Sequence, residues 1–241
     1  MSMEKATVFT NVQDSYLQGI KDCIPTLFGY MSVGFAFGIV GMASGLSILE
    51  IALLSIFVYA GAAQFIICAL MVAQAPISAI ILTTFVVNLR HLLLCLTLAP
   101  YFKEYSLLKN IGVGALVTDE TFGVATTKAV KQHYLHDRWI NGLNLTAYLC
   151  WLIVTIIGAV FGKWITNPDA LGLDYALAAM FVALLILQLD NVAASKVKHY
   201  LKIVLCVVVL MIVLSLFIPS HIAVLLSTVI AATVGVVTEP S

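Results

Sequence analysis

The sequence predicts an all-α, polytopic integral membrane protein with about eight transmembrane helices, or alternatively seven. Of its 241 residues, 62% are hydrophobic and only 10% are charged, whereas soluble domains carry about 25% charged residues. Apolar stretches of about 20 residues, the length that crosses a bilayer, alternate with short breaks. Because lipid offers no hydrogen-bond partners, such stretches must be helical. The formal net charge of zero gives no basic surface for nucleic acid.

Eight apolar segments of spanning length follow one another along the chain. They are Ile24–Met42, Ile48–Val72, Ile77–Ala99, Ile111–Val130, Leu143–Trp164, Tyr175–Leu189, Leu201–Ile218 and Ile222–Val237. The sixth segment is short and the last two could form one broken helix, which keeps seven spans as the alternative. We therefore expect a cytoplasmic or interfacial segment over 1–22, a single transmembrane transport domain over 23–238 and a short tail over 239–241.

Basic residues near the helix ends predict a cytoplasmic N-terminus, because Lys and Arg are enriched in cytoplasmic loops. With eight spans, the cytoplasmic segments would carry Lys5, Lys21, Lys128, Lys131, Arg138, Lys196, Lys198 and Lys202. The opposite loops would carry Lys103, Lys109 and Lys163. Before the first span, apolar residues at helical spacing from Phe9 to Ile20 indicate either a short interfacial helix or an ordinary soluble lead-in.

The first two apolar segments contain small residues and an isolated amide. Gly-x-x-x-Gly pairs begin at Gly34 and Gly41, and such pairs permit close helix approach; a broken helix with exposed carbonyl groups is the alternative. In the second segment a run of small residues separates Tyr59 from Gln64. An amide inside a membrane needs a partner, which is either a neighbouring helix or a ligand.

Charged residues interrupt the third and fourth apolar segments near their centres. The third contains Asn88, Arg90 and His91, and the fourth contains Asp119 and Glu120. A charge at the centre of a spanning helix costs roughly 2.5–3.5 kcal/mol on insertion scales. We therefore hypothesise that these residues line a transport pathway.

Arg90 and the two acids are predicted to meet near the membrane midplane. Arg90 lies nine residues before Ala99, and Asp119 lies eight residues after Ile111. At about 1.5 Å per residue, both would lie roughly 12–14 Å below the same ends of two adjacent antiparallel helices. An ion pair would reduce the insertion penalty of both partners, and the remaining acid, in low dielectric, could carry a proton. A purely structural ion pair is the alternative.

The same groups suit a zwitterionic ligand. A guanidinium such as that of Arg90 can bind a carboxylate, and Asp119 or Glu120 can bind an ammonium group. The expected apolar wall consists of Phe28, Phe35, Phe37, Phe65 and Phe85. Composition supports a polar pathway for a small solute, without choosing an amino acid over another zwitterion or anion.

Other chemistries have little support in the sequence. The five cysteines lie singly, without a Cys-x-x-Cys pair for a disulfide framework or zinc site. His133 and His136 fall in a short charged loop, where we expect no metal. Motifs of metalloproteases, serine hydrolases and phosphate-binding loops are missing. We expect neither catalysis nor a cofactor; an intramembrane enzyme or an accessory subunit of a membrane complex is the alternative.

Four motifs together resemble the AzlC family, the large subunits of bacterial branched-chain amino acid exporters. They are Pro25-Thr-Leu-Phe-Gly-Tyr30 with the Gly-rich run to Gly41, Tyr59-Ala-Gly-Ala-Ala-Gln-Phe65, Asn88-Leu-Arg-His91 and Thr118-Asp-Glu-Thr121. The resemblance covers nearly the whole chain, although after Trp164 it is one of hydropathy. It implies export of valine, leucine, isoleucine or related molecules such as methionine. It also implies a bacterial inner membrane and an AzlD-type small membrane subunit as partner.

The sequence therefore predicts a multi-pass permease that exports branched-chain amino acids and is coupled to the proton gradient. The expected substrate-binding residues are Arg90, Asn88, His91, Gln64, Tyr30, Tyr59 and Asn144, and the expected proton-coupling residues are Asp119 and Glu120. Asn144 is included because it begins a polar stripe with Tyr148, Trp151 and Thr155 in the fifth segment. A channel or transporter for another small solute is the alternative function.

Overall fold

The computed structural model describes residues 15–132, 134–165 and 194–238, with isolated positions between 175 and 189. The elements of these ranges are α1 (Tyr16–Ala43), α2 (Ile48–Phe57), α3 (Gly61–Val72), α4 (Ile77–Leu98), the short 3₁₀ helix η2 (Ala99–Phe102), α5 (Leu107–Gly114), α6 (Asp119–Gln132), α7 (Asp137–Gly162), α9 (Ala194–Ser215) and α10 (Ser220–Val237). Four stretches within them are long and apolar enough to cross a membrane: Tyr16–Ala43, Ile77–Phe102, Asp137–Gly162 and Lys196–Ser215. The all-helical membrane fold is thereby confirmed.

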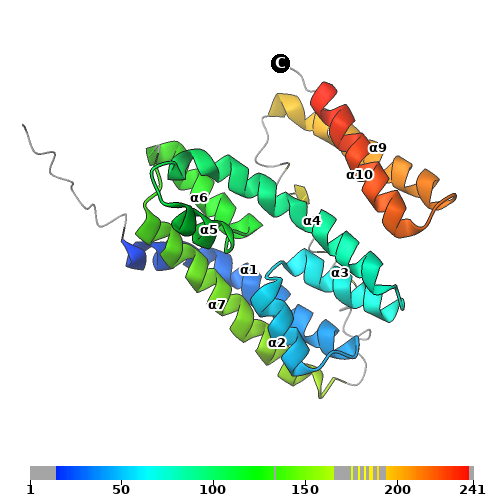
Figure 1. The fold of residues 1–241 in the computed structure, drawn as a ribbon, viewed down its shortest axis with the longest axis horizontal. Coiled ribbons are helices and arrows are strands. Elements are labelled where there is room, and N and C mark those ends of the chain that lie inside the picture. The colour runs from blue at the N-terminus through cyan, green and yellow to red at the C-terminus, as the bar shows by residue number, and fades with distance from the viewer. Residues whose placement is uncertain are drawn as a thin grey trace, which may run out of the picture.

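Helices α1 and α7 form a closely packed parallel pair (Figure 1). Glycines let the two backbones touch: a Cβ on Gly19 would collide with the carbonyl oxygen of Trp139, and one on Gly38 with that of Thr155. Because residues near the start of α1 meet residues near the start of α7, both helices begin at the same end of the molecule. We call this the starting end and the other the far end.

Two predictions for the first segment have different outcomes. The close approach expected at the first glycine pair is confirmed, because Gly34 and Gly38 both lie against α7. The interfacial segment expected over 1–22 is not separate from the first span in the part that the structure describes. Instead, α1 begins at Tyr16, where the Ser15 hydroxyl accepts a hydrogen bond from the Gln18 N–H, and continues without a break to Ala43.

The second predicted span, Ile48–Val72, is a hairpin of two half-length helices rather than one helix. Helix α2 descends from the far end and reaches α7, where the hydroxyls of Ser55 and Thr155 lie 2.9 Å apart. The chain then reverses at Tyr59, whose φ is +40°. Helix α3 returns toward the far end, with Phe65 packed on Phe37 at 5.6 Å between ring centroids, and α4 starts there (Figure 1).

The fourth predicted span, Ile111–Val130, is a second hairpin that enters from the starting end. There Lys109 of α5 forms an ion pair of 2.6 Å with Asp137, the first residue of α7. Helix α6 begins at Asp119 in the middle of the molecule and runs back to the same end. Its Lys128 ammonium lies 4.3 Å from the centroid of the Trp139 ring.

The prediction of continuous spans over these two segments is therefore wrong, and the reason is physical. The α2–α3 tip consists of apolar and small residues, so hydropathy stays high across the turn. At the α5–α6 tip, Asp119 and Glu120 follow an apolar run, and a helix that carries two charges gives the same pattern as a turn. Within residues 15–165, a spanning helix is twice followed by a hairpin, α1 by α2–α3 and α4 by α5–α6, and the second unit is inverted relative to the first (Figure 1). Inverted units of this kind are common in transporters, although the sequence shows no repeat.

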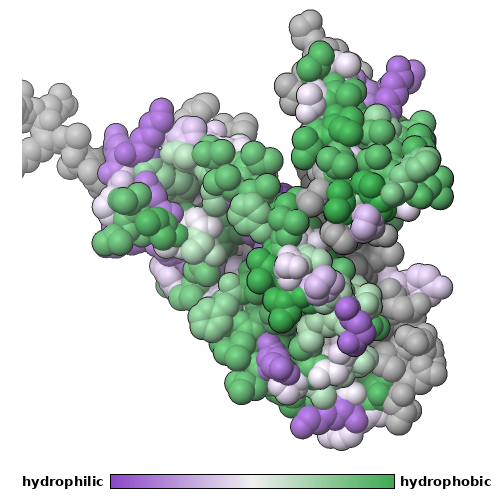
Figure 2. Space-filling view, turned by 45° about the vertical axis from the view of Figure 1, so that its right-hand side comes forward, coloured by the Kyte–Doolittle hydropathy of each residue, from purple (hydrophilic) through white to green (hydrophobic). Residues whose placement is uncertain are grey.

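The last two described helices pack on each other as a hairpin (Figure 1). Gly235 of α10 lies against Ile203 of α9. They match the predicted segments Leu201–Ile218 and Ile222–Val237, whereas most of Tyr175–Leu189 lies outside the described residues. Apolar side chains dominate the surface in Figure 2, and no part of the most apolar window of α9 is buried. Such a surface is suited to lipid.

The two hairpins predict an unusual pattern of chemical accessibility. In a chain whose native cysteines are replaced, Ala43→Cys and Ala73→Cys should react with a membrane-impermeant maleimide added to the same side of sealed vesicles. Ser106→Cys should react only from the opposite side. If positions 43 and 73 reacted from opposite sides of the vesicle, Ile48–Val72 would be one continuous span and the hairpin would be wrong.

The glycine contacts between α1 and α7 predict a position-dependent loss of stability. Gly38→Ala should lower the free energy of unfolding by at least about 1–3 kcal/mol, because the added methyl group meets the α7 backbone. Gly29→Ala is the matched control on the same helix, since a Cβ there meets nothing within 4 Å. Denaturant unfolding in detergent micelles measures both; equal stabilities of the two variants would refute this interface.

Candidate substrate site

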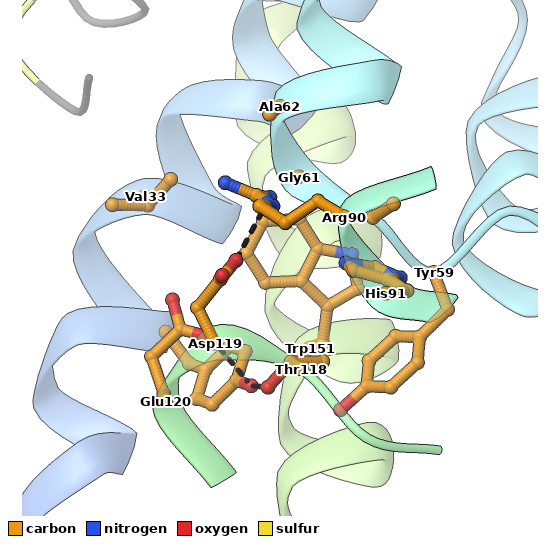
Figure 3. Close-up of a pocket in the computed structure, with 12 residues that line it drawn as sticks. Val33, Tyr59, Gly61, Ala62, Arg90, His91, Thr118, Asp119, Glu120 and Trp151 are labelled. Atoms are coloured by element: carbon orange, nitrogen blue, oxygen red, sulfur yellow. Dashed lines mark hydrogen bonds and ion pairs between the residues drawn. The ribbon is translucent and has the colours of Figure 1, made fainter. Parts of the chain in front are cut away.

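A polar pocket lies where the tips of the two hairpins meet α1, α4 and α7 (Figure 3). Its lining residues are Tyr30, Val33, Tyr59, Ala60, Gly61, Ala62, Arg90, His91, Thr118, Asp119, Glu120 and Trp151. The space measures about 410 Å³, part of it open to solvent.

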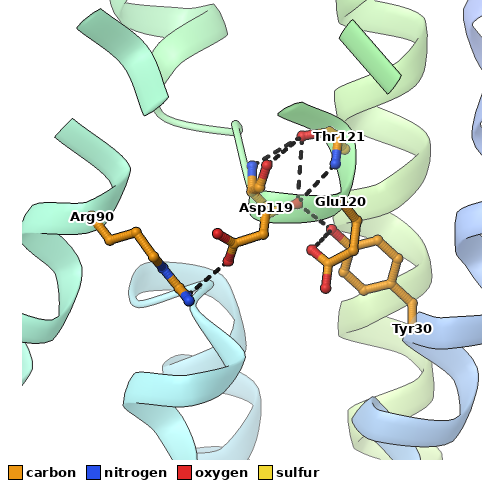
Figure 4. Close-up of polar contacts among 6 residues, drawn as sticks. Tyr30, Arg90, Asp119, Glu120 and Thr121 are labelled. Atoms are coloured by element: carbon orange, nitrogen blue, oxygen red, sulfur yellow. Dashed lines mark hydrogen bonds and ion pairs between the residues drawn. The ribbon is translucent and has the colours of Figure 1, made fainter. Parts of the chain in front are cut away.

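One wall of the pocket is an ion pair between α4 and the start of α6 (Figure 4). Arg90 Nη2 lies 2.8 Å from Asp119 Oδ2, with the two side chains 27% and 18% exposed. The antiparallel course predicted for these segments is present, because Cys95, one turn further along α4, donates a hydrogen bond to the carbonyl of Gly114. The predicted meeting of Arg90 with one acid is thus found, and the partner is Asp119.

The second acid takes part in a different network (Figure 4). The Tyr30 hydroxyl donates to Glu120 Oε2 at 3.1 Å and also bonds the Thr118 hydroxyl. Within the described part of the chain, no cationic side chain is paired with Glu120. Both acids lie in the first turn of α6, where the helix dipole stabilises negative charge.

Thr118 and Thr121 cap the start of α6 with side chains of their own hairpin. The Thr121 hydroxyl accepts from the Thr118 N–H at 2.9 Å, and the Thr118 hydroxyl accepts from the Thr121 N–H at 3.4 Å. These reciprocal bonds satisfy donors that the broken helix would otherwise leave unpaired. The cap therefore fixes the position from which Asp119 and Glu120 project.

A chain of buried hydrogen bonds lies behind the pocket. Trp151 Nε1 donates to Gln64 Oε1 at 3.0 Å, and Gln64 Nε2 donates to the Ser55 hydroxyl at 3.1 Å. Ser55 in turn bonds Thr155 of α7. The chain ties α2, α3 and α7 together and orients the Trp151 ring, whose edge meets Tyr30 at 5.6 Å between centroids. Every hydrogen bond of this chain joins two protein side chains.

The structure brings six of the nine predicted site residues to the pocket: Tyr30, Tyr59, Arg90, His91, Asp119 and Glu120. Gln64, Asn88 and Asn144 lie outside its lining. Gln64 is fully buried in the chain of hydrogen bonds behind it, and Asn144 donates to the carbonyl of Val113 near the end of α5. Gln64 and Asn144 therefore bond other protein groups, and the substrate and proton roles of all nine residues stay predictions.

The apolar wall differs from the one expected. Phe37 and Phe65 pack on each other in the core, whereas Phe28 and Phe85 are exposed on the outer surface. The apolar lining comes instead from Val33, Trp151 and the small residues at the start of α3, with Thr118 as a further polar group. Trp151 lies in the polar stripe that begins at Asn144, so the sequence contained a sign that it faces the pocket. It was not predicted as a site residue, because a tryptophan in such a stripe is more often a core residue.

The pocket and all the helices around it fall within one region of sequence similarity. The family described as AzlC protein matches residues 25–165, which include the pocket-lining residues of α1, both hairpins, α4 and α7. This match covers more than half of the chain. The chain belongs to the AzlC family. It is accordingly a multi-pass membrane protein of a transport family.

Curated relatives agree with this assignment. The inner membrane protein YgaZ of Escherichia coli (strain K12) is 29% identical over 177 residues, covering 71% of this chain and 72% of the relative. The branched-chain amino acid transport protein AzlC of Bacillus subtilis (strain 168) is 26% identical over 179 residues, covering 73% and 67%. An uncharacterized membrane protein of Helicobacter pylori (strain ATCC 700392 / 26695) is 28% identical over 199 residues, covering 81% and 86%.

No solved structure matches this chain. Helices α9 and α10 lie beyond the matched residues, in agreement with a sequence resemblance that carries motifs only up to Trp164.

The buried hydrogen bonds behind the pocket predict a structural role for Gln64. Gln64→Leu should lower the free energy of unfolding by about 1–3 kcal/mol, because it leaves the Trp151 indole N–H without its acceptor. Gln74→Leu is the control, since Gln74 is exposed in the turn after α3. Thermal unfolding in detergent, followed by tryptophan fluorescence, measures both variants. A Gln64→Leu protein as stable as the control would show that this hydrogen bond contributes nothing.

Proposed function

We propose that this AzlC-family protein exports branched-chain amino acids from the cytoplasm, without chemical change of the substrate, by exchange with protons. The observation that carries the proposal is the composition of the pocket between the hairpin tips. It holds one guanidinium, one carboxylate paired with it and a second carboxylate without a cationic partner among the described residues. A purely structural ion pair needs only Arg90 and Asp119, whereas Glu120 adds a second carboxylate whose described partner is the Tyr30 hydroxyl.

A zwitterionic amino acid complements these charges. Its carboxylate can bind Arg90, since guanidinium groups form strong charge-assisted hydrogen bonds with carboxylates. Its ammonium group can bind Glu120, and a branched aliphatic side chain can pack on Val33 and Trp151 in the lining. The name of the Bacillus subtilis relative, a branched-chain amino acid transport protein, supports this choice of substrate.

The charges of the empty pocket favour coupling to protons. The formal charges of Arg90, Asp119 and Glu120 leave one negative charge in a region of low dielectric, and one bound proton makes the set neutral. A neutral set is easier to rearrange inside a membrane than a charged one. The ammonium group of a bound substrate takes the place of this proton at Glu120, while the substrate carboxylate is held by Arg90. The carrier therefore moves outward with substrate and returns with a proton, so protons move inward as substrate moves outward.

The N-terminus is proposed to be cytoplasmic. Between residues 15 and 165, the basic residues near the starting end are Lys21, Lys103, Lys109, Lys128, Lys131 and Arg138, and the far end has Lys163. The hairpin geometry moves Lys103 and Lys109 to the side of the N-terminus. The bias of Lys and Arg thus becomes stronger than with continuous spans, which supports a cytoplasmic starting end in the bacterial inner membrane.

An AzlD-type small membrane subunit is the proposed partner, as the family resemblance implies. Leucine flux should increase when such a subunit is co-reconstituted with this chain, compared with this chain alone. An unrelated small membrane protein of similar length serves as the control. Full flux from this chain alone would remove the need for a second subunit.

Flux measurements test the substrate. Proteoliposomes loaded with radiolabelled leucine should release it, and Arg90→Ala should reduce release by at least about tenfold, because the substrate loses its cation and Asp119 its partner. Arg90→Lys keeps the positive charge but lacks the paired N–H donors of the guanidinium, and it should retain part of the flux. Folding of each variant is checked by its elution and thermal unfolding in detergent. Unchanged release by folded Arg90→Ala would contradict the assigned role.

The pH gradient tests the coupling. Leucine release by the wild-type protein should accelerate when the external medium is acidic, and a protonophore should remove the acceleration. Asp119→Asn and Glu120→Gln each remove one site for a proton, and at least one of them should lose the acceleration while retaining leucine–leucine exchange. Wild-type flux that ignores the gradient would indicate an uncoupled channel instead.

A further inference from the structure

Helix α3 begins at the pocket without a side-chain cap. Its N-cap residue is Ala60, no side chain bonds its first N–H groups, and the first turn is Gly61-Ala62-Ala63. The first N–H groups of any helix lack partners within the helix. Together they carry roughly half a positive charge, which makes an uncapped N-terminus a favourable place for an anion.

The other hairpin presents a helix start of opposite character. Helix α6 is capped by Thr118 and Thr121, and its first turn carries Asp119 and Glu120. Both helix starts line one pocket. The half of the pocket at α3 therefore carries the partial positive charge of an uncapped helix start, whereas the half at α6 carries two carboxylates.

Two polar atoms at the pocket lack hydrogen-bond partners in the described part of the chain. One is Arg90 Nε, although Nη2 of the same side chain is paired with Asp119; Figure 3 shows this side chain beside Gly61 and Ala62. The other is the hydroxyl of Tyr59, a residue only 6% exposed. That hydroxyl lies near the Tyr30 hydroxyl without hydrogen-bond geometry and points toward Trp151 and Thr118 (Figure 3). Both atoms are buried and have no partner in the described part of the chain.

We propose that the backbone N–H groups of Gly61 and Ala62, together with Arg90, bind the carboxylate of an α-amino acid. Glu120 then receives the ammonium group, so that the substrate lies with its two charged ends between the two hairpin tips. This inference rests on the proposed function and adds to it the orientation of the substrate and a backbone carboxylate site. A compound that lacks either charged group loses one half of the site.

Gly61 is part of this site for steric reasons. A Cβ at this position would lie 2.9 Å from the Trp151 ring, and Trp151 is itself held by Gln64. With glycine there, the start of α3 can lie against the indole and still line the pocket. The small side chain of Ala62 likewise leaves the backbone open to a ligand atom.

Substrate analogues test the inference without altering the protein. Leucinamide keeps the side chain and the ammonium group of leucine but replaces the carboxylate by a neutral amide. Detergent-purified full-length protein should bind leucine at least about tenfold more tightly than leucinamide, since hydrogen bonds to charged groups are about twice as strong as neutral ones. Isothermal calorimetry gives both affinities.

A proline substitution tests the backbone directly. Ala62→Pro removes one N–H in the first turn of α3, where proline is tolerated, and should weaken leucine binding about tenfold with little change for leucinamide. Leu108→Pro is the matched control, because Leu108 holds the same position in α5, is exposed and lies outside the pocket. It should leave the affinity for leucine unchanged.

Each outcome is decisive. Equal affinities of the wild-type protein for leucine and leucinamide would overturn the carboxylate site while leaving the proposed function intact. An equal loss of both ligands in Ala62→Pro would overturn the backbone contribution. Absence of binding by leucine, valine and isoleucine would overturn the proposed function, and the inference with it.

Discussion

A helix that is broken inside a membrane leaves backbone N–H and C=O groups that lipid cannot satisfy, and this constraint shapes the centre of the protein. Each hairpin tip must find its partners within the protein. The α5–α6 tip finds them in the hydroxyls of Thr118 and Thr121 and in the amide of Asn144, which binds the Val113 carbonyl. The α2–α3 tip receives the Tyr148 hydroxyl at the Ile56 carbonyl, but its helix start remains without a side-chain cap.

The parallel pair of α1 and α7 provides the frame against which both tips are held. Glycine contacts along the pair fix two backbones at a separation that larger residues would not permit. Each hairpin then bonds this frame from its own side, through Ser55 and Thr155 at one tip and through Tyr30 and Thr118 at the other. The charged residues come together because the frame sets where each tip stops.

The sequence alone predicted the chemistry of this centre better than its geometry. Arg90 and Asp119 could be paired from their depth, because a charge in an apolar segment is conspicuous and helical rise is regular. The hairpins could not be predicted, because the α2–α3 tip contains no proline and no charge, and the charges of Asp119 and Glu120 at the α5–α6 tip are equally compatible with one continuous helix that lines a polar pathway. The partners of Gln64 and Asn144 could not be predicted either. Gln64 bonds Trp151, which is distant in the sequence, and Asn144 bonds a backbone carbonyl, which the sequence pattern does not reveal.

The backbone of Tyr59 shows that the two hairpin tips are built differently. A non-glycine residue in the left-handed region costs roughly 1–2 kcal/mol, and Tyr59 adopts it at the tip where α2 turns into α3. That tip holds conformational energy and an uncapped helix start, whereas the opposite tip is closed by its own threonines. Two hairpins of inverted direction are therefore held in different ways: the α2–α3 hairpin is fixed by the buried hydrogen bonds of Ser55 and Gln64 to α7 while its helix start stays open, and the α5–α6 hairpin is closed at its own tip by Thr118 and Thr121.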